Sequence, residues 1–321
     1  MTDGAINTAS EFAYRKLEET RAERTRRGLV FTAVIIAAIV ITLAAPALYL
    51  AIVGIDAADG TITFAISMAV FVLALLTYLR STRSAKIAVN RLKREINGAI
   101  AQDIGFTYEP EAIRPPEFGE AAAAGLFDKG DIALFEDRWE RYDAEHVIRI
   151  TDTQTRSSNG EYSTTYFRGA LAAIDLKTDG GHAIKLLSRR THMTRRIRKS
   201  REEDPLQEFE TGDEQFDRRY RAMGDSAEAV RDFFDADMRR EIAALVDHFR
   251  PGFIGRIFRL NPLSFAVTGK YVVVTVSAKK LFESVILRPG NDRARVDTVR
   301  EDIARISRFL HILAEKASGS A

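Results

Sequence analysis

The sequence predicts an α+β protein in which an N-terminal two-helix transmembrane hairpin precedes a mixed cytoplasmic domain with antiparallel hairpins and a long C-terminal helix. Three observations support this prediction: two long uncharged runs near the N-terminus, β-rich segments separated by turns in the middle, and a heptad-like apolar seam near the C-terminus. We divide the chain into a cytoplasmic N-terminal helix (1–27), the hairpin (28–79), a juxtamembrane helix (80–104) and the cytoplasmic domain (105–321).

The composition narrows the classes of function. The 321 residues carry a formal net charge of +2, and 46% of them are apolar. Domains that bind nucleic acid are usually strongly basic, so nucleic acid is not a favoured partner of the whole chain. The absence of cysteine excludes disulfides, thiolate metal sites and a cysteine nucleophile.

Each predicted span is an uncharged run long enough to cross a bilayer. The spans cover residues 28–55 and 61–79, and the short acidic turn DAADG joins them. A membrane-spanning helix needs about 20 apolar residues. Pro46 removes one backbone hydrogen bond and is expected to kink the first span. Two alternatives stay open: a pair of buried core helices, and a cleaved signal peptide formed by the first run.

The flanking charges predict how the hairpin is oriented. Lys and Arg precede the first span and follow the second, whereas the turn between the spans carries only Asp56 and Asp59. The positive-inside rule places both termini in the cytoplasm. With two spans, the protein is expected to be integral to the lipid bilayer, which is then its first predicted partner. The flanking basic residues are Arg15, Lys16, Arg21, Arg24, Arg26 and Arg27, then Arg80, Arg83, Lys86, Arg91, Lys93 and Arg94.

The juxtamembrane helix is expected to continue from the second span. Val89, Leu92, Ile96 and Ala99 recur at helical spacing. The proline-rich segment 108–119 should end this helix. The region that follows, roughly 200 residues, is long enough to bury one core.

The middle of the chain predicts antiparallel strands. Asn159 and Gly160 separate two β-rich runs at 146–156 and 161–176, and an Asn-Gly pair in that context favours a tight hairpin. The turn TDGG then leads into a third predicted strand at 182–188.

The last third of the chain predicts a second hairpin between helices. Residues 225–249 have the pattern of one or two helices, and residues 263–278 that of a hairpin with its turn at Gly269. Residues 296–317 predict a long helix, whose apolar seam either packs on its own domain or mediates self-association of the chain through 296–313. The seam consists of Val296, Val299, Ile303, Ile306, Leu310 and Leu313.

A run of positive charge follows the third predicted strand. Between Arg189 and Arg201 there are seven Lys or Arg and no acid. The run is either a solvated loop or a binding segment, for which anionic lipid headgroups, an acidic protein and nucleic acid are the alternatives. The candidate binding residues are Arg189, Arg190, Arg195, Arg196, Arg198, Lys199 and Arg201.

The sequence contains no recognisable catalytic motif. The five histidines lack the spacing of metal ligands on one helix, and no phosphate-binding loop, dinucleotide fingerprint or nucleophile elbow occurs. We therefore predict no cofactor, no metal and no catalytic residue. The segments 135–146 and 209–225 mix charges of both signs, which is typical of solvated faces. Trp139 and Tyr142 are candidates for lining a binding groove.

The order of these parts resembles an uncharacterised bacterial family of two-span membrane proteins, domain of unknown function 3137. The resemblance rests on the hairpin and on four motifs, and it covers most of the region from Ile96 to Glu283; the basic run departs from it. The motifs are GLFDKGDIALFEDRWERYDAEHVI, YFRGALAAIDL, FETGDEQFDRRYRAMGDSAEAVRDFFDADM and LSFAVTGKYVVVTVSAKKLFE. The resemblance implies a bacterial inner-membrane protein with a cytoplasmic α+β domain, and its occurrence near LemA-type envelope proteins implies a role in envelope maintenance.

Two functional hypotheses follow from the sequence. The first is a membrane-anchored interaction module that binds a protein partner or anionic lipid on the cytoplasmic side. The alternative is a membrane-tethered enzyme with an unrecognised active site, which would require polar side chains that converge in a pocket with apolar walls.

Overall fold

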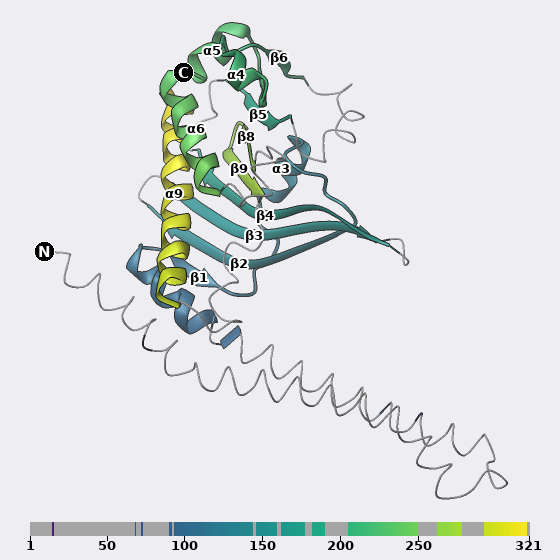
Figure 1. The fold of residues 1–321 in the computed structure, drawn as a ribbon, viewed down its shortest axis with the longest axis vertical. Helices are drawn as coiled ribbons and strands as arrows, with labels where there is room; N and C mark the ends of the chain where they lie inside the picture. The colour runs from purple at the N-terminus through teal and green to yellow at the C-terminus, as the bar shows by residue number, and fades with distance from the viewer. Residues whose placement is uncertain are drawn as a thin grey trace, which may run out of the picture.

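The structure is a computed structural model that describes residues 15, 68, 72, 90–91, 93–143, 146–158, 162–176, 182–189, 205–249, 262–277 and 292–319. These residues form one nine-stranded antiparallel sheet in the order β1-β2-β3-β4-β9-β8-β5-β7-β6. The long helix α9 and the shorter α6 run side by side across one side of the sheet, and the short helix α3 lies on the other side (Figure 1).

The elements have the following bounds. The strands are β1 Thr107–Glu109, β2 Ile132–Tyr142, β3 Val147–Ser158, β4 Ser163–Asp175, β5 Ile184–Ser188, β6 Gln207–Phe209, β7 Tyr220–Gly224, β8 Leu263–Val267 and β9 Tyr271–Ser277. The helices are α3 Phe118–Ala123, α4 Glu214–Asp217, α5 Ala227–Phe233, α6 Ala236–Phe249 and α9 Asp292–Gly319. A further helix, described over 93–103, precedes β1.

The predicted hairpins are confirmed by the strand register. Ser158 of β3 pairs with Ser163 of β4, and Val267 of β8 pairs with Val272 of β9. The third predicted strand is also present as β5, but it lies between β8 and β7 rather than beside β4. β9 takes the place next to β4, so a strand that comes late in the chain is inserted into the middle of the sheet.

The core has two layers because alternate residues of each strand point to opposite faces. On the face that α9 and α6 cover, Ile150 of β3 packs with Ile303 of α9 and Ile242 of α6. On the face that α3 covers, Phe118 packs with Leu171 of β4. The helix over 93–103 belongs to the first layer through Ile96, Ile100 and Ala101.

The apolar seam of α9 is part of this core. Each of its six residues is 0% exposed, and the seam packs against the sheet of its own domain. Of the two alternatives for the seam, packing on its own domain is therefore confirmed, and self-association through 296–313 is the one that is wrong. A heptad-like spacing places apolar side chains along one face of a helix. Such a face can pack on a sheet as well as on a second helix.

The predicted transmembrane hairpin is not supported. Of the helices in the part of the chain given above, none is both long enough and apolar enough to cross a membrane. The predicted spans at 28–55 and 61–79 lie outside the described residues, apart from Met68 and Val72. An uncharged run of sufficient length is a requirement for a span and does not by itself establish one.

Several predictions depended on that hairpin and are corrected with it. They are the fold class with its membrane-spanning part, the bilayer as an integral partner, and a multi-pass location in a bacterial inner membrane with both termini cytoplasmic. The described architecture is instead the nine-stranded antiparallel sheet with its covering helices.

Candidate functional site

A groove between α4 and α6 is the candidate functional site. It encloses a cavity of about 370 Å³, within the range of pockets that bind ligands. Its floor is apolar and consists of the buried side chains of Phe216, Tyr220, Ile242 and Val246. The remaining lining residues are Asp213, Gln215, Arg219, Ala236, Arg239, Arg240, Ala243 and Asp247.

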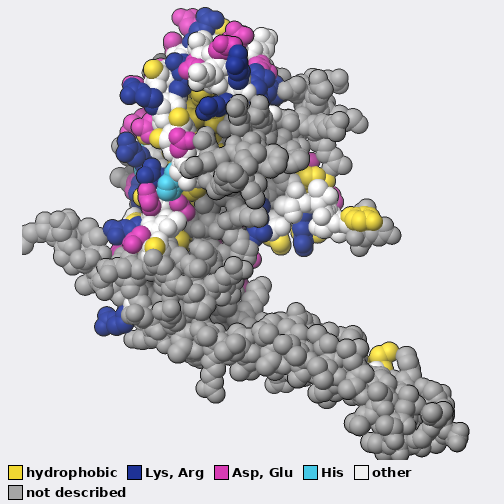
Figure 2. Space-filling model, viewed as in Figure 1, with side chains coloured by type: hydrophobic (Ala, Val, Ile, Leu, Met, Phe, Trp, Pro, Cys, Tyr) yellow, Lys and Arg dark blue, Asp and Glu magenta, His cyan; other side chains and the backbone are white. Residues whose placement is uncertain are grey.

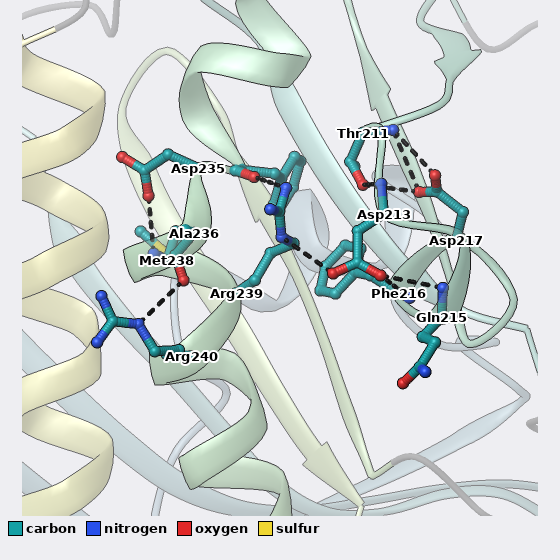
Figure 3. Close-up of polar contacts among 11 residues, drawn as sticks. Thr211, Asp213, Gln215, Phe216, Asp217, Asp235, Ala236, Met238, Arg239 and Arg240 are labelled. Atoms are coloured by element: carbon teal, nitrogen blue, oxygen red, sulfur yellow. Dashed lines mark hydrogen bonds and ion pairs between the residues drawn. The ribbon is translucent and has the colours of Figure 1, made fainter.

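The wall at α4 is fixed by capping interactions. The carboxylate of Asp213 accepts the backbone N–H groups of Gln215 and Phe216 at 3.0 and 3.1 Å, and thus caps α4 (Figure 3). The carboxylate of Asp217 accepts hydrogen bonds from the backbone N–H and the hydroxyl of Thr211. These bonds hold the short helix in place and turn Phe216 into the floor of the groove.

The opposite wall is the first three turns of α6. Asp235 accepts the backbone N–H of Met238 at 2.8 Å and so caps this helix. Lys316 of α9 also donates to Asp235. Burial raises the pKa of Asp235, but the hydrogen bonds from Lys316 and Met238 outweigh it and leave the pKa below its ordinary value. The cap stays ionised at neutral pH, as an anion at a helix N-terminus should.

The arginines of the rim differ in how firmly they are held. Arg239 donates to the carbonyl of Phe234 at 2.8 Å and faces Asp213 at 3.5 Å, so its guanidinium has a fixed position (Figure 3). Arg240 pairs with Asp237, and both side chains are about four-fifths exposed at 79% and 80%. An exposed pair of this kind contributes about 0–1 kcal/mol, so Arg240 can exchange its partner at little cost.

The surface around the groove carries both signs of charge. Figure 2 shows Lys and Arg interspersed with Asp and Glu on the described surface of the face in view. The net charge of +2 agrees with this distribution. No large field of one sign is visible on the described surface of that face.

A buried polar cluster lies beside β2, away from the groove. Lys93 donates to Asp137 at 2.8 Å, and Tyr108 donates to the other oxygen of the same carboxylate. Burial raises the pKa of Asp137, and Lys93 opposes that effect. Burial and the charge of Asp137 raise the pKa of Tyr108. The cluster joins the helix over 93–103 to β1 and β2, which is a structural task.

A second polar contact joins α6 to α9. His248 Nε2 lies 2.7 Å from Asp302 Oδ1, and Asp302 is 6% exposed. Burial raises the pKa of Asp302, while the bond to His248 lowers it. The described residues contain no group of three or more His, Cys, Asp or Glu that could hold a metal ion.

The basic run contributes one residue to the described structure. Arg189 donates from Nε to the carbonyls of Asp217 and Tyr220 at 2.6 and 2.9 Å, and it pairs with Glu208. Its guanidinium is engaged within the domain, and its role as a binding residue stays a prediction. The other six candidates, Arg190, Arg195, Arg196, Arg198, Lys199 and Arg201, lie outside the described residues.

Trp139 and Tyr142 do not line one groove. Trp139 is 0% exposed and packs against Tyr108 in the core, with ring centroids 4.9 Å apart. Tyr142 is 67% exposed. The two positions are three apart on β2, and an odd separation places side chains on opposite faces of a strand. The prediction of a binding groove lined by Trp139 and Tyr142 is therefore wrong.

The residues of the observed groove were not among the predicted ones. Segment 209–225 mixes charges, and this pattern suggested only a solvated face. One signal in α6 was available: Ala236, Arg240, Ala243 and Asp247 recur at steps of three and four. These residues share one exposed face of the helix, and two small side chains on an exposed face leave room for another molecule.

Comparisons with known proteins do not assign the chain to a family. No protein-family model matches it, and no curated protein matches it. Among solved structures, the chain is similar to the crystal structure of the mycobacterial trehalose monomycolate transport factor A, TtfA. The identity is 12% and the TM-score 0.36, over 70% of this chain and 96% of that chain. A likeness at this TM-score carries no argument about function. The resemblance to domain of unknown function 3137 stays a prediction.

Proposed function

We propose that the protein is an interaction module that binds a segment of a partner protein in the groove between α4 and α6. The observation that carries the proposal is the combination of an apolar floor and a charged rim in one cavity of about 370 Å³. Peptide-binding grooves use such an apolar floor for affinity and the polar rim for orientation.

The polar groups outside the groove make contacts within the domain, and this supports the groove as the binding site. The cluster at Asp137 and the pair of His248 with Asp302 connect elements of the domain to each other. The guanidinium of Arg189 does likewise. The rim of the groove differs, because Gln215 and Arg240 present polar side chains to the outside.

Photo-crosslinking in cells tests this proposal. A benzophenone amino acid replaces Gln215 at the groove, and in a second variant it replaces Tyr162, which is 74% exposed next to β4. The full-length chain carries either substitution. We expect a discrete crosslinked species from position 215 and not from position 162. The same crosslinks from both positions, or none from position 215, would contradict the proposal.

A further inference from the structure

We infer, on the basis of the proposed function, that the groove binds an amphipathic helix. The apolar face of this helix packs on the floor, and acidic residues lie beside that face at one end. The partner is thus a protein segment of defined length, conformation and charge pattern. Length, backbone chemistry and the position of charges along α6 each supply a separate reason.

The length of the groove suits about three helical turns. The α6 residues that line it extend from Ala236 to Asp247. At a rise of 1.5 Å per residue, this wall is about 16 Å long. Ala236 and Ala243 are exposed and lie on the lining face two turns apart. Side chains this small allow the backbone of a second helix to approach closely.

Backbone chemistry favours a helix over an extended strand. An added strand needs a row of free backbone N–H and C=O groups at a sheet edge. The walls of this groove are helical, and the N–H groups of their first turns that the helices leave open are bonded to the caps, Gln215 and Phe216 to Asp213 and Met238 to Asp235. A helical segment satisfies its own backbone and offers the apolar side chains that the floor accepts.

The charges of the rim determine the charge pattern of the segment. Arg239 and Arg240 lie near the N-terminal end of the α6 wall, and Asp247 lies at its C-terminal end. Arg219 lines the opposite wall. Asp213 is already engaged with α4 and Arg239. Arg239 is held in that same pair, whereas the exposed pair of Arg240 with Asp237 can exchange, so a carboxylate of the partner gains most beside Arg240.

Three labelled synthetic peptides of about 15 residues provide the probe, so that about 11 residues span the wall of about 16 Å and about two extend beyond it at each end. All three share leucines at i, i+4 and i+7 in a background of Ala and Gln. Two positions beside the first leucine are Glu in one peptide, Gln in the second and Lys in the third. Fluorescence anisotropy measures their affinity for the full-length chain.

The matched variants are Arg240→Glu and Arg218→Glu. Both arginines are mostly exposed, and both pair with a neighbouring acid of their own helical turn. Arg240 lines the groove, whereas Arg218 is not among its lining residues. The two substitutions change the net charge equally, so a general electrostatic effect would appear in both.

We expect the wild type to bind the Glu peptide about tenfold more tightly than the Lys peptide, with the Gln peptide in between. Arg240→Glu should abolish this preference, and Arg218→Glu should preserve it. Equal affinities for the three peptides, loss of the preference in both variants, or no binding of any peptide would overturn the inferred partner chemistry. Crosslinking at position 215 does not depend on these peptides, so it reports separately on the proposed function.

Discussion

At the scale of single residues, the negative charge of a partly buried acidic side chain lowers the stability of the folded domain. Asp152 of β3 lies near Asp137 and Glu136, and burial together with these charges raises its pKa to about 6 from the ordinary value of 3.8. The folded state therefore binds the Asp152 proton more tightly than the unfolded state does. Its contribution favours folding at low pH and is lost as the pH rises through about 6.

The first prediction concerns the variant Asp152→Asn. At pH 8 the variant should have a larger free energy of unfolding than the wild type, by about 1–2 kcal/mol, since it removes a partly buried negative charge. At pH 4 the two proteins should differ little, because Asp152 is then largely protonated. Urea unfolding at both pH values measures the difference. A difference that does not change with pH would contradict the raised pKa.

The second prediction concerns the buried pair of Lys93 and Asp137. Lys93→Met leaves the carboxylate of Asp137 buried without its cation, so the free energy of unfolding should fall by about 3–5 kcal/mol. The double variant Lys93→Met with Asp137→Asn should regain part of that loss, because it removes the unpaired charge as well. Thermal or urea unfolding of the three proteins gives the comparison. Additive losses would show that the two side chains do not interact.

At the scale of elements, the sequence predicts periodic segments well and interrupted ones poorly. The hairpins β3–β4 and β8–β9 follow from alternating patterns and turn residues. β2 was missed because a β-bulge shifts its register between Glu136 and Arg138. Asp137 sits in the bulge with φ of 47°. A bulge exchanges the faces of the residues on either side of it, so Phe135 and Trp139 enter different core layers and the alternation disappears from the sequence.

The third prediction concerns α9. Ile303 and Leu310 are both 0% exposed in the core. Replacing both with Asp should unfold the domain, because a buried unpaired charge costs several kcal/mol. Arg300→Asp with Arg308→Asp, two substitutions of the same helix outside the seam, serve as the control and should leave the fold intact. Circular dichroism and size-exclusion chromatography measure the outcome. A folded double variant of the seam would contradict its place in the core.

At the scale of the whole molecule, patterning along the chain could indicate the exposed face of α6 but not the groove that this face lines. The groove brings Phe216 and Tyr220 of one segment against Ile242 and Val246 of another. No periodicity within either segment predicts that contact, because the contact depends on how α6 packs beside α4. The prediction of two membrane spans rested on local hydropathy alone, and no helix in the described part of the chain is long and apolar enough to cross a membrane.

The measurement closest to the central claim is hydrogen–deuterium exchange of the full-length chain with and without the Glu peptide. The groove between α4 and α6 predicts slower exchange in residues 211–220 and 236–247, which bound peptide would cover and stabilise. Exchange in the strands β3 and β4 should stay unchanged. Protection confined to other segments, such as the faces of α6 and α9 around Ala244 and Ala304, or no protection at saturating peptide, would contradict the assignment of this groove as the binding site.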